Sequence, residues 1–416
     1  MTSAHAVGAA ADSVSGTNTT LLRGQMLTPV WIELGEEGQT VARVIVNAPK
    51  DCPVVEIAGA TRPMELRTPV PAGFKPVCEL MMSASVAEAS VNGQALPLPR
   101  PNPQHVVAFG DTGCRIQPPR VQACNDPAQW PFAQVASSIA EAHPDLAIHV
   151  GDYNYREDNC PPSQATLCGG TPSGDNWDTW NAEFFAPAAK MLATVPLALA
   201  RGNHEDCKRS WRGWFYYLDP RPWKDSCTKF SPPYVIRLGQ FELAMLDSAS
   251  ISEAELVPKD VRRFRRQLQL LRVTNAWLVD HHPFWAIRVE SDSPQYVFNT
   301  PSLKAAWDSV RPKGINLLVS GHTHLFEMLS LSEDRPPQLV AGDGGTALHN
   351  PLPIALGGIQ VVGAAFISGE SVHEFGYSVL SKSPDGWDLA LKNPAGETLA
   401  KCAVRRYHAD CTGPQQ

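Results

Sequence analysis

Five short apolar runs in this chain are each followed by side chains that can bind a metal ion. Aspartate offers a carboxylate oxygen, asparagine a carbonyl oxygen and histidine an imidazole nitrogen, and this mixture suits iron, manganese and zinc. The runs span residues 106–109, 146–150, 196–200, 277–279 and 315–319, and the polar residues after them are Asp111, Asp152, Asn203 with His204, Asp280 with His281, and His322 with His324. Two ions held about 3.5–4 Å apart need more ligands than one ion does, so the surplus of donors favours a binuclear site.

The elements that must position these side chains are the strands and helices of an α/β fold. Short apolar runs are typical of buried parallel strands, and the carboxyl ends of such strands are where an open α/β sheet places its ligands. We therefore expect the five strand ends to build one shared site. Asp126-Pro127 and Thr300-Pro301 predict helix starts between the strands. The runs 375–380, 387–391 and 398–404, separated by Pro-Asp-Gly and Pro-Ala-Gly, predict consecutive hairpins.

The order and spacing of these motifs resemble those of the binuclear metallophosphoesterases, the calcineurin-like phosphoesterase superfamily, and within it the purple acid phosphatases. The matching segments are Gly110-Asp111-Thr112-Gly113, Gly151-Asp152-Tyr153-Asn154-Tyr155, Gly202-Asn203-His204-Glu205, His281-His282-Pro283 and Gly321-His322-Thr323-His324. Each motif alone is weak evidence, but together they follow the family's order. The resemblance implies a metallophosphoesterase domain built as a two-sheet βαβ sandwich, an α/β fold, with a small amino-terminal all-β sandwich domain as in several larger purple phosphatases.

Tyr155 bears on the identity of the first metal ion. Many relatives carry Asp-x-His in the first motif, whereas this chain has Asp111-Thr112-Gly113. Tyr155, three residues after Asp152, stands where the purple phosphatases place a phenolate that binds ferric iron and colours the protein. A phenol with a pKa near ~10 stays protonated in water, but a trivalent ion at bonding distance ionises it. The resemblance thus predicts Fe(III) at the first site.

The resemblance also implies two sets of ligands that share one carboxylate. The first set, for Fe(III), is Asp111, Asp152, Tyr155 and His324. Asp152 would bridge to a second ion, Fe(II), Mn(II) or Zn(II), whose further ligands are Asn203, His281 and His322. The family pattern counted from Val279 points to His282, whereas the position two residues before Pro283 points to His281. We prefer His281, and His282 stays the alternative.

His204 is the predicted catalytic side chain. It follows Asn203, so the same strand end should aim it into the cleft, where it protonates or hydrogen-bonds the leaving oxygen. Phosphoryl transfer is mostly positioning and charge stabilisation, so two cations and a metal-bound hydroxide attacking in line need no protein nucleophile. The expected enzyme is a hydrolase, an acid phosphatase that cleaves small phosphomonoesters.

Two other functions stay open. The first is a phosphodiesterase or nucleotide-cleaving enzyme of the same superfamily, and the second is a noncatalytic surface or binding protein. Arg201, Glu205 and Asp206 lie close to the predicted ligands in sequence, and we weigh a substrate-contacting or supporting role for them against a solvated surface role. We expect His349 to be structural or superficial, like the other histidines outside the motifs, and Asp343-Gly344-Gly345 to be a loop near the cleft.

Composition excludes several classes of partner. Among the 416 residues 43% are apolar, and no apolar run approaches the ~20 residues that span a bilayer, so we expect no membrane-spanning segment. The net charge of −7 argues against nonspecific nucleic-acid binding. The four arginines between residues 262 and 266 alternate with apolar residues at helical spacing, which indicates an amphipathic helix with a solvated basic face.

The ten cysteines fall into neighbouring pairs, which indicates short-range disulfides. The expected pairs are Cys52 with Cys78, Cys114 with Cys124, Cys160 with Cys168, Cys207 with Cys227, and Cys402 with Cys411. Zinc binding is the competing account, but no Cys-x-x-Cys pair supports it. Disulfides imply an oxidising compartment, periplasmic or extracellular. Residues 1–20 show no export signal and are expected to be a disordered leader, and a removed signal peptide would explain this.

The chain is predicted to have two domains. Short strand-like runs divided by glycine and proline between residues 30 and 80 indicate a small β-sandwich, and Pro97, Pro99, Pro101 and Pro103 indicate a stiff extended linker. The predicted limits are 1–20 for the leader, 21–98 for the β-sandwich, 99–103 for the linker and 104–416 for the catalytic domain. The β-sandwich could act in spacing or in pairing between subunits, so a homo-oligomer is left open.

Overall fold

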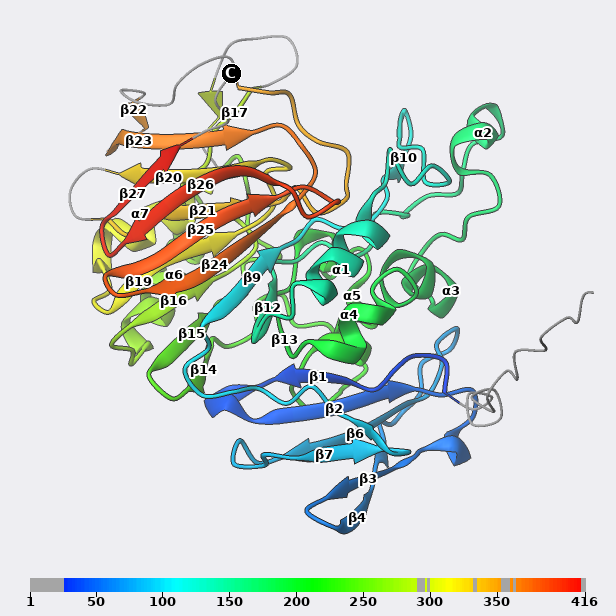
Figure 1. Ribbon diagram of the computed structural model, residues 1–416. Coiled ribbons are helices and arrows are strands. Elements are labelled where there is room, and N and C mark those ends of the chain that lie inside the picture. Colours follow the sequence, from blue (N-terminus) through cyan, green and yellow to red (C-terminus); the bar gives the residue numbers. More distant parts are fainter. Residues whose placement is uncertain are drawn as a thin grey trace, which may run out of the picture.

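Two β-sheets packed face to face form the centre of the molecule, with helices on their outer faces (Figure 1). This computed structural model describes residues 26–289, 296–297, 300–331, 335–352, 360–361 and 364–412, and the predicted leader lies outside them. Apolar side chains from the inner faces of both sheets, such as Ile148 of the first and Leu317 of the second, share one buried core. The predicted two-sheet α/β architecture is confirmed.

The first sheet has 11 strands, and a parallel centre carries three of the predicted runs. The centre consists of β9 (His105–Phe109), β12 (Leu146–His149) and β13 (Leu197–Leu199). On one side follow the antiparallel strands β24 (Tyr377–Ser383), β25 (Gly386–Lys392), β26 (Thr398–Arg405) and β27 (His408–Thr412). The predicted carboxyl-terminal hairpins are therefore present, and β27 is one strand more than the sequence pattern indicated.

The second sheet has eight strands and carries the other two runs at its parallel centre. Its strands are β14 (Tyr234–Leu238), β15 (Phe241–Met245), β16 (Ala276–Val279), β19 (Ile315–Ser320), β21 (Gln338–Ala341), β20 (Phe326–Leu331), β23 (Ala364–Val372) and β22 (Gln360–Val361). All five predicted runs are thus strands, three in one sheet and two in the other.

The helices bury one apolar face against a sheet. In α6 (Pro258–Leu270), Phe264 and Leu268 are buried while Arg265 and Arg266 are exposed, as the helical spacing predicted. Helix α7 (Pro301–Val310) begins at Pro301 as expected. Helix α1 (Phe132–Glu141) begins later than predicted, because Asp126 and Pro127 form a turn in which the Asp126 carbonyl accepts from Gln129 N at 3.0 Å. The helix α4 (Ala189–Thr194) also covers the first sheet.

The amino-terminal region forms a β-sandwich that continues the first sheet (Figure 1, blue). The strands β1 (Trp31–Leu34), β2 (Thr40–Ile45), β6 (Val77–Met82) and β5 (Glu65–Leu66) extend that sheet beyond β13. A smaller sheet, separate from the two central ones, packs on these strands. It consists of β3 (Val54–Ile57), β4 (Ala60–Pro63), β7 (Ala89–Val91) and β8 (Gln94–Ala95). Because β1 pairs with β13 at Glu33 and Leu197, one sheet contains strands from both sides of the predicted linker at 99–103. The predicted domain limits stay a prediction.

All five predicted disulfides are present, with the predicted partners. The described residues contain no free cysteine, so zinc binding by thiolates has no ligands among them. The Cys114–Cys124 bond closes a hairpin of β10 (Ile116–Gln117) and β11 (Arg120–Val121), and Cys402–Cys411 joins neighbouring strands. No helix among the described residues has the length and apolar character needed to cross a membrane.

Candidate metal centre

The ends of the five predicted strands meet at one edge of the two-sheet core, as expected. Three of the polar residues there, Asp111, Asp152 and His322, have left-handed backbone conformations, with φ of 54°, 62° and 68°. Such conformations are uncommon for residues other than glycine and persist where the surrounding structure enforces them, often at functional sites. Here the strain turns each side chain toward the same cleft, and His322 N donates to Asp111 Oδ2 at 3.0 Å.

Gly151 shows how tightly the backbone packs behind this edge. Its φ is 106°, and a Cβ atom added there would lie 2.7 Å from His281 Nδ1 and 2.8 Å from the Gly202 backbone. Only glycine fits, so the residue before Asp152 lets the loops after β12, β13 and β16 approach one another.

The first group of donors surrounds the Tyr155 hydroxyl. Tyr155 Oη lies 2.6 Å from Asp152 Oδ2, 2.8 Å from His324 Nε2 and 3.1 Å from Asp111 Oδ1. His324 Nε2 is 3.4 Å from Asp111 Oδ1. All four side chains are buried. These are the four residues predicted for the first metal ion.

The second group surrounds the side-chain oxygen of Asn203. Asn203 Oδ1 lies 2.8 Å from His281 Nε2 and 3.0 Å from His322 Nδ1. His281 Nε2 also lies 3.2 Å from Asp152 Oδ2, the same oxygen that approaches Tyr155. Asp152 therefore belongs to both groups, which is the position a bridging carboxylate needs.

His281, and not His282, faces this second group. His281 Nδ1 donates to the Val150 carbonyl at 2.8 Å, which leaves Nε2 to face Asn203 and Asp152. The Ser248 hydroxyl lies 3.3 Å from His282 Nδ1, and His282 belongs to a different possible donor group, with Glu253 and His322. The geometry therefore favours the preferred alternative.

The tautomers of these histidines suit a metal ion. His281 and His324 each donate from Nδ1 to a backbone carbonyl, of Val150 and Ala347, as metal-binding histidines commonly do. In the neutral rings the lone pair of Nε2 then faces the oxygen atoms of the centre. In the absence of an ion a proton on His281 Nε2 can join it to Asn203 Oδ1 and Asp152 Oδ2, and a bound cation would take the place of that proton. The residues present therefore fit bound cations.

The buried carboxylates also indicate that the site fits bound cations. Asp111 and Asp152 are buried, and among the described residues their ion-pair partners within 4 Å are histidines alone. Burial raises the pKa of Asp111 to about 7. Burial and the carboxylates of Asp152 and Asp111 raise the pKa of the Tyr155 phenol well above its usual value. A cation that replaces the lost hydration would favour the ionised form of these oxygen donors.

His204 lies beside both groups and reaches the cleft. Its ring centroid is 3.7 Å from that of Tyr155, and its backbone N–H donates to Asp152 Oδ1 at 2.9 Å. His204 Nδ1 is 2.7 Å from Glu157 Oε1, and Nε2 is 3.9 Å from Asp152 Oδ2. Glu157 thus orients the ring so that Nε2 faces the donors.

Two buried glutamates hold the loops that carry the donors. Glu205 accepts from the backbone N–H groups of Asp152, Tyr153, Asn154 and Gly202 at 2.8–3.1 Å. Glu183 accepts from Tyr155 N at 2.8 Å and pairs with Arg156. Glu205 is therefore a supporting residue and not a solvated one.

A family model for the calcineurin-like phosphoesterases matches residues 105–326, more than half of the chain. The chain belongs to the calcineurin-like phosphoesterase family. No curated protein matches the sequence. The family assignment makes the protein a phosphoester hydrolase, and together with the two donor groups it indicates a binuclear metal site.

Solved structures show the same fold at low sequence identity. The purple acid phosphatase PPD1 from yellow lupin (Lupinus luteus) seeds has a TM-score of 0.57 and 13% identity, over 92% of this chain and 74% of that one. The structure of PhoD has a TM-score of 0.57 and 11% identity, over 97% and 94%. The chain is thus a phosphoesterase with a purple acid phosphatase-like fold.

Several cleft residues of this phosphoesterase were missed from the sequence. His349, expected to be structural or superficial, lines the cleft, and its ring stacks on His324 with centroids 4.3 Å apart. Glu253 lies 3.1 Å from His322 Nε2. Arg201 is buried and pairs with Asp247 at 3.1 Å, away from the cleft. The two missed residues, His349 and Glu253, stand on loops outside the motifs, where no periodic pattern marks them.

Proposed function

We propose that this phosphoesterase is an acid phosphatase that hydrolyses small phosphomonoesters at an Fe(III)–M(II) centre, with Fe(II), Mn(II) or Zn(II) as the second ion. The proposal rests on the position of the Tyr155 hydroxyl, which lies within 3.1 Å of Asp111, Asp152 and His324. A trivalent ion at bonding distance would ionise the phenol, and ferric iron is such an ion. Asn203, His281 and His322 would hold the second ion.

Bound metal ions would neutralise the charge of the phosphate and acidify a water molecule. The protein's own side chains would manage the leaving group. His204, held by Glu157 at 2.7 Å, keeps a nitrogen toward the donors, where it can supply a proton to the leaving oxygen. The loops held by Glu205 and Glu183 keep the donors in place, so little reorganisation is needed at the moment of reaction.

Charge in the cleft favours a monoester over a diester. Arg115, Arg120, Arg209 and Arg288 line it. Arg209 pairs with Glu157 and Arg288 with Glu253, so Arg115 and Arg120 exceed the one remaining carboxylate of the lining, Asp152. A phosphomonoester dianion carries one more negative charge than a diester, so it gains more from this surplus. No comparable observation favours a nucleic-acid partner.

The test compares p-nitrophenyl phosphate with bis(p-nitrophenyl) phosphate on the iron-loaded full chain at acid pH. We expect kcat/KM for the monoester to exceed that for the diester at least about tenfold, and His204→Ala to lower kcat about 10²- to 10³-fold with unchanged metal content. A preference for the diester would show a phosphodiesterase instead. Full activity of His204→Ala would remove His204 from the mechanism.

We also propose that the protein works in an oxidising compartment, periplasmic or extracellular. Five disulfides in one chain support this, because reducing compartments keep thiols reduced. Thiol titration of the denatured protein purified from its native source should find no free thiols, and ten reactive thiols would contradict the proposal.

A further inference from the structure

The hairpin β10–β11 forms one wall of the cleft beside the candidate metal centre. Arg115 precedes β10 and Arg120 begins β11, and both side chains line the cleft together with Tyr155, His204 and the other donors. The cleft has a volume of about 720 Å³, so it can hold much more than the phosphate that is cleaved.

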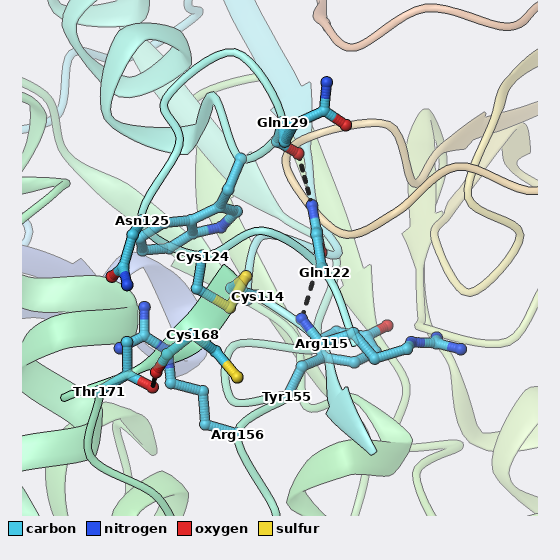
Figure 2. The surroundings of a disulfide bond; sticks show 12 residues. Cys114, Arg115, Gln122, Cys124, Asn125, Gln129, Tyr155, Arg156, Cys168 and Thr171 are labelled. Atoms are coloured by element: carbon cyan, nitrogen blue, oxygen red, sulfur yellow. Dashed lines mark hydrogen bonds between the residues drawn. A yellow bond between two sulfur atoms is a disulfide. The ribbon is translucent and has the colours of Figure 1, made fainter. Parts of the chain in front are cut away.

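Bonds to neighbouring segments hold the base of the hairpin in place, close to Tyr155 (Figure 2). The Cys114–Cys124 disulfide closes its base, and Ile116 N donates to the Tyr155 carbonyl at 3.0 Å. The Gln122 side-chain oxygen accepts from Arg115 N at 3.2 Å, and its amide donates to the carbonyls of Gln129 and Gly345 at 2.7 and 2.8 Å. The backbone that carries Arg115 is therefore positioned before any ligand binds.

Arg115 and Arg120 have positive charges that the protein leaves uncompensated. The Arg115 guanidinium carbon lies 5.2 Å from the centre of the Tyr155 ring, so the group is next to the first set of donors. In the described part of the chain neither arginine has a carboxylate within 4 Å. By contrast, Arg209 pairs with Glu157 at 3.4 Å and Arg288 with Glu253 at 3.8 Å.

The other residues that line the cleft indicate which chemical class of ligand it can bind. Among the described residues the apolar lining consists of Val121, Ala347 and Leu348, and neither Phe nor Trp is part of it. The Tyr155 ring already packs against Arg115 and His204. The described part of the cleft thus presents no open aromatic face to a nucleobase but has an excess of arginine, the residue best suited to bind phosphate.

We propose that Arg115 and Arg120 bind a second phosphate group of the substrate, so that the enzyme prefers small substrates carrying two phosphates. The proposal rests on the proposed phosphatase function. In hydrolysis the oxygen of water forms a bond to the scissile phosphorus, the bond to the leaving oxygen breaks, and that oxygen takes up a proton. The second phosphate stays on the leaving group, held by the two arginines.

The kinetic test compares two substrates that differ in one phosphate, fructose 1,6-bisphosphate and fructose 6-phosphate. For the metal-loaded full chain we expect kcat/KM to be about tenfold or more higher for the bisphosphate, and Arg120→Gln and the double variant Arg115→Gln/Arg120→Gln to reduce this ratio stepwise toward one. Arg120 is exposed, so its replacement should not disturb folding. Arg265→Gln, on the exposed face of α6, should keep the wild-type ratio.

A binding measurement separates this proposal from the proposed function. Calorimetric titration of the full chain with inorganic pyrophosphate and with orthophosphate should show tighter binding of pyrophosphate, and the double variant should lose about tenfold in affinity for pyrophosphate. If the wild type and the double variant have the same ratio of kcat/KM values for the two substrates and the same affinity for pyrophosphate, the proposed subsite is wrong. A protein that binds pyrophosphate through the arginines but hydrolyses no phosphoester would instead overturn the phosphatase function.

Discussion

Three donors converge on the Tyr155 hydroxyl, and a phenolate there would distinguish the proposed iron centre from a site for two divalent ions. Its pKa is raised by burial and by Asp152 and Asp111, so the ring stays neutral unless a strong Lewis acid binds. This residue therefore carries the clearest prediction about metal identity.

We predict that the iron-loaded protein is violet and that Tyr155→Phe is colourless, because the variant lacks the phenolate that ferric iron requires for this absorption. Tyr153→Phe is the matched control. Tyr153 is also buried, but its hydroxyl donates to the Ala200 carbonyl at 3.0 Å and takes no part in the donor groups, so the colour should persist. Visible spectra with metal analysis give the result. A colourless wild type with two divalent ions would place the protein among the general metallophosphoesterases.

The neighbouring histidines 281 and 282 allow an equally direct comparison. His281→Ala removes a nitrogen 2.8 Å from Asn203 Oδ1, so we expect the variant to retain about one metal ion fewer per chain. His282→Ala should keep both ions, because His282 is not among the donors around Asn203 and Asp152. Elemental analysis after dialysis measures the metal content. If His282→Ala alone lost an ion, the ligand assignment would be reversed.

At the scale of elements, strand β20 carries a buried glutamate directly after the last motif. Glu327 accepts from Ile287 N with both oxygens, at 3.1 and 3.3 Å, and no ion pair with it occurs among the described residues. Burial raises the pKa of Glu327 from 4.5 to about 8. The folded state therefore holds the proton more tightly than the unfolded chain does.

The raised pKa of Glu327 decides whether the stability of the fold rises or falls with pH. The contribution of Glu327 to stability is complete below pH 4.5 and is lost as pH rises to about 8, at a cost on the order of a few kcal/mol. Glu327→Gln should remove most of this loss, so the variant should unfold at higher denaturant concentration than wild type at pH 8 and similarly at pH 4.5. Urea unfolding at several pH values measures it. Identical pH profiles of the two proteins would show that Glu327 is not the group responsible.

At the scale of the whole molecule, a buried polar network joins the amino-terminal strands to the catalytic part. Arg43 on β2 pairs with Glu33 on β1 at 2.9 Å and donates to the carbonyls of Tyr217 and Asp219 at 3.0 and 2.7 Å. Arg67 donates to the same Asp219 carbonyl at 3.0 Å. Since β1 also pairs with β13, the two regions share a sheet and a network.

We predict that Arg43→Met destabilises the whole molecule by about 3–5 kcal/mol, because it leaves Glu33 buried without its partner. The double variant Arg43→Met/Glu33→Gln should recover part of this loss, since a neutral amide replaces the buried carboxyl group that has lost its partner. Equilibrium unfolding followed by both tryptophan fluorescence and circular dichroism measures the effect. A loss below about 1 kcal/mol would mean that the network does not join the two regions energetically.

The sequence by itself indicated the strand ends that carry the donors, and the motifs there carried the resemblance to the family. These depend on a local signal, an apolar run followed at once by polar residues. For the cysteines the sequence suggested pairs of neighbours, and the structure has the same pairs. The sequence also predicted the amphipathic helix α6 from the spacing of Phe264 and Leu268.

The tertiary structure decided which neighbours face the centre and what surrounds it. His281 and His282 differ in direction because the Val150 carbonyl, just after strand β12, accepts a hydrogen bond from the ring of His281. His349 and Glu253 reach the cleft from loops, and Arg120 from the short strand β11; packing between distant segments sets the course of all three segments, and no local pattern encodes it. The continuation of the first sheet into β1 depends likewise on a pairing between Glu33 and Leu197, residues far apart along the chain.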